Sequence, residues 1–132
     1  MRNTIALFGE TEKGEYKTAY FCQSVVQLMD NFGHPPKESH GLHCAIQFIM
    51  HDCNLIFFRV QEEGYSIGDY LTGLSFLENN QFVSQLGALC LPGVGNSEII
   101  EATSPVCGIH NSLLIMNEAD LYDYLTESCY SL

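Results

Sequence analysis

Glycines and lysines close to the N-terminus mark the stretch of this sequence best suited to binding a ligand. Residues 4–18 are TIALFGETEKGEYKT, in which a short apolar run stops at Gly9 and a loop with Gly14 carries Lys13 and Lys17. The pattern predicts a strand, a tight turn and the start of a helix, which is how an α/β sheet builds a ligand-binding edge. The lysines would attract an anionic group.

This turn differs from a phosphate-binding P-loop, G-x-x-x-x-G-K-[ST], in its last residues. Gly9 and Gly14 have the required separation, but two further residues stand between Gly14 and Lys17-Thr18. The insertion moves the lysine and threonine off their phosphate and Mg²⁺ positions, and no apolar strand ends in an aspartate that would hold the metal. We therefore expect no P-loop NTPase, and no cofactor is indicated.

Basic residues are scarce, so their positions are informative. The chain has 5 Lys and Arg against 16 Asp and Glu, a formal net charge of −11. Three of the five, Lys13, Lys17 and Arg59, fall at expected carboxyl ends of strands, and the turn at residues 93–97 adds backbone N–H groups at a helix N-terminus. We predict that an anionic small molecule, such as a nucleotide, binds there. The predicted site residues are Gly9, Lys13, Gly14, Lys17, Thr18, Arg59, Glu62, Tyr65, Gly93, Gly95, Asn96 and Ser97.

The lysines allow a second interpretation. Lys13 and Lys17 would then be solvent-exposed residues paired with Glu10, Glu12 and Glu15. Exposed pairs of this kind are common and contribute little. Gly93-Val94-Gly95 is only a fragment of the dinucleotide fingerprint G-x-G-x-x-G, which is absent from the first turn.

An enzyme at the same edge is a further alternative. Glu62 and Glu63, beside Arg59, are the best candidates for a general base, and adjacent strand residues point to opposite faces, so at most one would enter a cleft. Cys107 and His110 are close in sequence, but the expected layout puts them at a helix end away from this edge. The sequence indicates no reaction type.

Histidines on the second predicted helix are candidate metal ligands. His40, His43 and Cys44 have i, i+3 and i+4 spacing, and His51-x-Cys53 forms a second pair. His43 and His51 would be about 12 Å apart along a helix, too far to share one ion. A closed zinc site needs four ligands. We therefore predict a polar, partly exposed histidine face and no metal site.

Cysteines and composition limit the class of protein. None of the six cysteines forms a C-x-x-C pair, so we expect buried, reduced thiols, with Cys90 inert in the middle of a strand. No apolar run reaches the roughly 18–20 residues of a membrane span, and no signal peptide is indicated, which predicts a cytoplasmic protein. The negative charge disfavours nucleic acid and anionic membranes as partners.

Alternating apolar runs and helical stripes across residues 1–132 predict a single domain in the order β-α-α-β-α-β-α-β-α. Strands separated by helices pair in parallel through right-handed crossovers. We therefore expect an α/β three-layer sandwich with a four-stranded parallel sheet of Rossmann/flavodoxin-like type. The predicted strands are Ile5–Phe8, Leu55–Val60, Leu86–Leu91 and Ser112–Met116, and the predicted helices are Tyr16–Phe32, Gly41–Asp52, Ile67–Asn79, a short one after Ser97 and one after Asn117.

Local signals define several helix ends. Ser39, Asn96 or Ser97, and Asn117 are the expected N-terminal caps of three helices. Pro105 should break or kink the fourth helix just before it, because proline removes a backbone hydrogen bond.

Two glycines lie within the third predicted helix. Gly68 and Gly73 should each weaken it by roughly 1 kcal/mol relative to Ala.

An assembly role without catalysis is the remaining alternative. An open sheet leaves two edge strands that can pair with another chain. Aromatic residues make up 11% of the sequence, and an exposed patch of Phe82, Tyr122, Tyr124 or Tyr130 would suit a homo-oligomer.

Overall fold

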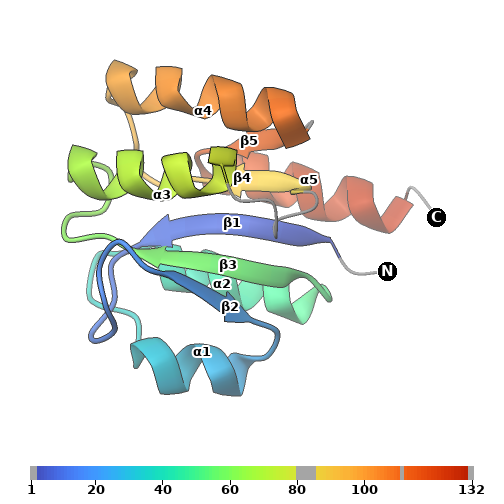
Figure 1. Cartoon of the computed structure of the whole chain (residues 1–132). Helices are drawn as coiled ribbons and strands as arrows, with labels where there is room; N and C mark the ends of the chain where they lie inside the picture. The colour runs from blue at the N-terminus through green and yellow to red at the C-terminus, as the bar shows by residue number, and fades with distance from the viewer. Residues whose placement is uncertain (1–2, 80–85, 111, 131–132) are drawn as a thin grey trace.

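A mostly parallel five-stranded sheet carries helices on both faces (Figure 1). The computed structural model describes residues 3–79, 86–110 and 112–130. Within these ranges no helix has the length and apolar character needed to span a membrane. The strands are β1 (Thr4–Gly9), β2 (Ala19–Cys22), β3 (Asn54–Arg59), β4 (Ala88–Cys90) and β5 (Leu113–Ile115), and the helices are α1 (Val25–Phe32), α2 (Gly41–Met50), α3 (Ile67–Asn79), α4 (Ser97–His110) and α5 (Glu118–Tyr130).

The sheet has the strand order β2-β3-β1-β4-β5. β1 pairs in parallel with β3 and with β4, and β4 pairs in parallel with β5. These four strands are the predicted ones, and their parallel pairing is confirmed. From β1 the chain forms β2 and then β3 on one side of β1, and it then crosses to β4 on the other side. The strand order therefore reverses between β1 and β4.

The predicted strand number is wrong, because the sheet has a fifth strand. β2 lies on the outer edge of β3 and runs antiparallel to it, with Ala19 opposite Phe58 and Cys22 opposite Leu55. The predicted helix over Tyr16–Phe32 therefore begins only after β2. The Ser24 hydroxyl caps α1 by accepting the Gln27 N–H at 3.2 Å. In β2 the backbone N–H and C=O groups form hydrogen bonds with β3. In the predicted helix the same groups would have formed hydrogen bonds within the helix.

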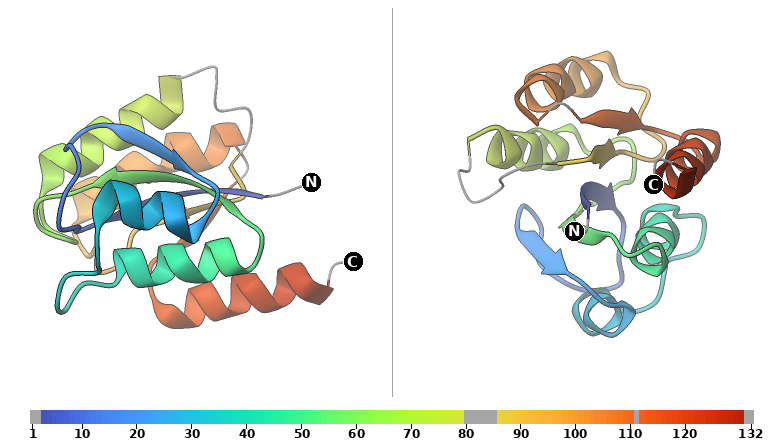
Figure 2. Two further views of the ribbon diagram at one scale, coloured as in Figure 1. Left: turned by 90° about the horizontal axis from the view of Figure 1, so that it is seen from below. Right: turned by 90° about the vertical axis from the view of Figure 1, so that its right-hand side faces the viewer.

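Alternate residues of β1 face two separate cores. Ile5 and Leu7 pack with α1, α2 and α5, whereas Ala6 and Phe8 pack with α3 and α4. The left view of Figure 2 looks onto the first set of helices, with the second set behind the sheet. Burial of both faces explains why the central strands are continuous apolar runs rather than alternating ones.

One predicted helix cap is wrong, and the break that was one of two expected effects of a proline does not occur. Ser39 does not cap α2; its hydroxyl donates to the Pro36 carbonyl at 2.8 Å, and the N-cap residue is His40. Pro105 lies inside α4, which continues to His110 instead of breaking. The packing of α4 against α3 through buried side chains such as Val106 maintains the helix despite the missing N–H.

Gly68 and Gly73 of α3 have opposite surroundings, so alanine at each should have opposite effects on stability. A methyl group on Gly73 would overlap the ring of Phe8, while a methyl group on Gly68 would meet nothing within 4 Å. Gly73→Ala should lower the free energy of unfolding by about 1–3 kcal/mol through overpacking. Gly68→Ala should raise it by up to about 1 kcal/mol through helix propensity. Urea unfolding measures both, and equal effects of the two variants would contradict this packing.

Candidate functional site

The carboxyl ends of the parallel strands assemble one edge of the sheet from distant segments. The loops that follow β1, β3, β4 and β5 meet there, and α2 begins there because it runs back toward the amino ends of the strands. In open α/β sheets this edge is where ligands bind.

Glu63 lies at the centre of this edge. Its carboxylate Oε1 accepts the backbone N–H groups of Glu10 at 3.2 Å and Gly41 at 2.9 Å, and Oε2 accepts that of His40 at 2.7 Å. The His40 side chain makes no capping hydrogen bond, so Glu63 from the β3–α3 loop caps α2 instead. A carboxylate of the protein itself thus occupies the anion position that a helix N-terminus offers.

Gly9 is a packing residue in this arrangement. A Cβ atom on Gly9 would lie 2.7 Å from the Cα atom of Gly41, and a Cβ atom on Gly41 would lie 2.6 Å from the Cα atom of Gly9. Only glycine at both positions lets the start of α2 approach the end of β1 this closely. That approach places the α2 backbone donors within reach of Glu63.

Arg59 contacts backbone and ring groups of the loop between β1 and β2. Its guanidinium donates to the carbonyls of Gly14 and of Thr11, the latter at 3.1 Å, and lies 4.3 Å from the centre of the Tyr16 ring. These contacts stabilise the loop between β1 and β2. Because these partners are two backbone carbonyls and one aromatic ring of the loop, the guanidinium is directed at the loop rather than at a ligand.

The other predicted residues of that loop lie on its outside. Lys13 and Lys17 are exposed, and the Thr18 hydroxyl donates to the Tyr16 carbonyl. Arg59 is therefore the only one of the three predicted basic residues whose polar contacts place it against the body of the protein. None of the three hollows described below is lined by Lys13, Lys17 or Arg59.

A second group of predicted residues is brought together. Tyr65, Gly93, Gly95 and Asn96, with Gly64, line a hollow of about 270 Å³ that we call the Tyr65 hollow. The Asn96 amide oxygen accepts the N–H groups of Glu98 at 2.8 Å and Ile99 at 3.3 Å. The predicted cap of α4 is confirmed. These N-terminal donors of α4 are thus satisfied by the chain itself.

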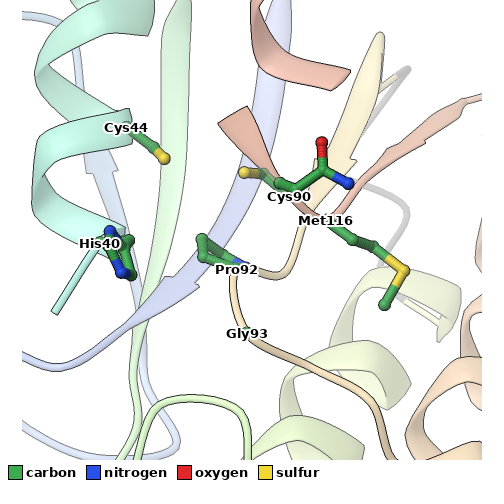
Figure 3. A pocket seen from close by; sticks show the side chains of 7 residues that line it. His40, Cys44, Cys90, Pro92, Gly93 and Met116 are labelled. Carbon is green, nitrogen blue, oxygen red and sulfur yellow. The ribbon is translucent and has the colours of Figure 1, made fainter. Parts of the chain in front are cut away.

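Sequence reasoning missed the hollow next to it, which we call the thiol pocket. It measures about 300 Å³ and lies between the start of α2 and the loops after β4 and β5 (Figure 3). It shares Gly93 with the Tyr65 hollow. Its lining residues are His40, Cys44, Cys90, Pro92, Gly93, Met116 and Asn117.

A third hollow, the α2–α5 groove, continues from the thiol pocket. The two share His40 and Cys44, and the groove has a volume of about 440 Å³. Its other lining residues are His43, Ile46, Gln47, Leu121, Tyr122 and Leu125. The thiol pocket therefore adjoins both other hollows.

The Cys90 thiol in the lining of the thiol pocket has a perturbed pKa. The hydrogen bond with Cys44 and burial raise the pKa of the Cys90 thiol well above its ordinary value, and the nearby charges of Glu63 and Asp120 raise it further. Cys90 is the last residue of β4 rather than a mid-strand residue, so its side chain reaches the pocket. These surroundings keep the Cys90 thiol in its neutral form.

The other candidate metal ligands and catalytic residues lie at separate places in the fold. His43 on α2 and His51 directly after it are exposed, and across residues 3–79, 86–110 and 112–130 no cluster of His, Cys, Asp and Glu could hold a metal ion. His110 is buried with Nε2 3.1 Å from the Leu77 carbonyl, and burial raises the pKa of Cys107. Glu62 is exposed on its loop.

Spacing in the sequence could not reveal the Cys44–Cys90 pair, because its members come from different elements. The available signal was positional: Cys90 directly precedes Leu91-Pro92-Gly93, where a strand ends, and Cys44 lies in the first turn of α2. Both positions belong to the carboxyl edge of a parallel sheet.

Glu63→Gln should destabilise the fold, because a glutamine amide presents one acceptor where three N–H donors converge. We expect a loss of about 1–3 kcal/mol in the free energy of unfolding. The neighbouring exposed Glu62→Gln is the matched control and should change it by less than about 0.5 kcal/mol. Denaturant unfolding at neutral pH compares the two, and an unchanged Glu63→Gln variant would show that this cap contributes nothing.

Comparisons of the chain with protein-family models, curated proteins and solved structures found no match. The chemistry of the carboxyl edge is therefore inferred from the residues that line it.

Proposed function

We propose that this chain is a small-molecule-binding domain whose ligand occupies the thiol pocket and extends into an adjoining hollow. The observation that carries the proposal is the position of the pocket. His40 and Cys44 of α2 line one side, and Cys90 and Gly93 from the end of β4 line the other. The ligand would thus lie beside the point where the strand order reverses between β1 and β4.

The order of the parallel strands supports the same proposal. Taken alone, β3-β1-β4-β5 is the order 2-1-3-4 of a Rossmann/flavodoxin-like sheet, to which we assign the fold. Sheets of that kind bind ligands in the crevice at the strand-order reversal. In this interpretation β2 is an antiparallel addition at the edge of β3.

The lining of the pocket defines the class of ligand. Its residues are mainly apolar or sulfur-containing, with His40 and Asn117 as polar groups and with neither lysine nor arginine. The Nη groups of Arg59 and the N–H groups of His40 and Gly41, which an anionic ligand would need, already have partners in the protein. We therefore favour a neutral or cationic ligand of low molecular weight over the anionic nucleotide indicated by the sequence. The volume of about 300 Å³ is at the lower end for ligand sites.

A thermal-shift panel tests this proposal. Neutral aromatic compounds and small amines should raise the melting temperature, whereas nucleotides and inorganic phosphate should not. For a stabilising compound, His40→Ala should weaken binding about 2- to 10-fold through the loss of one hydrogen bond. His51→Ala, at the other end of α2, is the control and should leave Kd unchanged. Stabilisation by nucleotides alone would favour the anionic ligand, and no stabilisation by any class would overturn ligand binding.

Self-association through β2 is a second candidate function, favoured by the exposed apolar side chains on that side. Phe21 of the edge strand is 59% exposed, and Val26 of α1 is 69% exposed. The aromatic patch expected from the sequence is wrong at Tyr124, which is buried, although Tyr122 is exposed. Phe82 and the Tyr130 side chain lie outside the described residues.

Light scattering after size exclusion tests this assembly. We expect a dimer that Phe21→Lys converts to a monomer, because a charge on an edge strand opposes pairing with another chain. Tyr122→Lys is the control. Tyr122 lies on α5 rather than near β2, so this variant should remain dimeric. A monomeric parent chain at high concentration would exclude this candidate.

A further inference from the structure

Cys44 and Cys90 face one another across the thiol pocket. Figure 3 shows the two sulfur atoms pointing toward each other, one from α2 and one from the end of β4. The two thiols are joined by a side-chain hydrogen bond. A disulfide between them requires the two sulfur atoms to approach to about 2.05 Å.

The remaining thiols of the described residues have different surroundings. The Cys22 sulfur accepts from Asn31 Nδ2 at 3.7 Å, and the Cys53 thiol donates to the His51 carbonyl at 3.9 Å. Cys107 lies half-buried among the residues around α3 and α4. Among the five cysteines whose side chains are described, Cys44 and Cys90 are thus the pair that lines one hollow together.

Access to the pair is unequal. Cys44 is 7% exposed and lines both the thiol pocket and the α2–α5 groove, whereas Cys90 is 1% exposed and lines the thiol pocket alone. Cys44 is therefore the more accessible of the two thiols, and we expect an external reagent to react with it first. Cys90 lines the same pocket and faces Cys44, in position to react with the modified residue.

We propose that Cys44 and Cys90 are a reversible modification site that forms a disulfide by exchange with a low-molecular-weight disulfide, RSSR. In the first step the Cys44 thiolate attacks one sulfur of RSSR, the S–S bond of the reagent breaks, and the leaving RS⁻ takes up the Cys44 proton as RSH. In the second step the Cys90 thiol loses its proton, its sulfur attacks the Cys44 sulfur of the mixed disulfide, the Cys44–SR bond breaks, and the leaving RS⁻ takes up that proton as the second RSH. The two protein thiols are oxidised by two electrons, and RSSR is reduced to two RSH.

The charge around the pocket sets a preference among reagents. Because Glu63 and Asp120 place negative charge near Cys90, a cationic disulfide should react faster than an anionic one.

The resulting Cys44–Cys90 disulfide would link the first turn of α2 covalently to the end of β4. A cross-link between positions so far apart in the sequence constrains the unfolded chain, so the oxidised protein should melt at a higher temperature.

Peptide mapping of the folded, full-length chain tests the site without any other ligand. The chain is incubated with cystamine, remaining thiols are blocked with N-ethylmaleimide, and the protein is digested without reduction. We expect a Cys44–Cys90 linked peptide as the main product, its reversal by dithiothreitol, and slower formation with glutathione disulfide. Because this assay involves only the thiols, its outcome is independent of the ligand proposed above.

Three variants identify the order of events. Cys90→Ser should accumulate the mixed disulfide on Cys44, and Cys44→Ser should leave Cys90 unmodified in the folded protein. Cys22→Ser, which removes another buried thiol, is the control and should form the linked peptide at the parental rate. Linkage between other cysteines at equal yield, persistent cysteamine on Cys44 of the parent chain, or reaction only in denaturant would overturn the proposal.

Discussion

A single carboxylate joins the three segments on which the carboxyl edge depends. Glu63, from the loop after β3, accepts the backbone N–H groups of Glu10 at the end of β1 and of His40 and Gly41 at the start of α2. Charge-assisted hydrogen bonds of this kind are stronger than neutral ones. The cap works only because Gly9 and Gly41 permit close contact between β1 and α2. Together these interactions determine where α2 begins, and therefore where His40 and Cys44 lie.

The same cap determines the chemistry of the edge. A helix N-terminus usually attracts an external anion, but here an internal carboxylate has taken that place. Asn96 satisfies the first donors of α4 in a similar way, and Asn117 does so for α5 by accepting the Asp120 N–H. What remains open at the strand-order reversal is a pocket with thiols, apolar side chains and negative charge nearby. Neutral or cationic ligands and cationic disulfides suit such a pocket for the same electrostatic reason.

Arg59 shows that tertiary contacts can give a residue a role that its position in the sequence does not indicate. Its position at the end of β3 was consistent with a ligand-binding cation, yet its guanidinium donates to two loop carbonyls and stacks on Tyr16. A loop as long as the one between β1 and β2 exposes many backbone carbonyls, and a cation with several donors can satisfy more than one of them. The loop then continues into β2. The first residues of the predicted helix therefore form an edge strand.

Local pattern determined much of the architecture. The apolar runs that became β1, β3, β4 and β5, separated by helical stripes, require parallel pairing, and asparagine caps at Asn96 and Asn117 were recognisable from residue type. Tertiary structure alone decided that Ala19–Cys22 pairs with β3, that Glu63 caps α2, and that Cys44 meets Cys90. Periodicity reports which face of an element is buried. It carries no information about which distant element covers that face, because the choice depends on strand order and on how closely two backbones can approach.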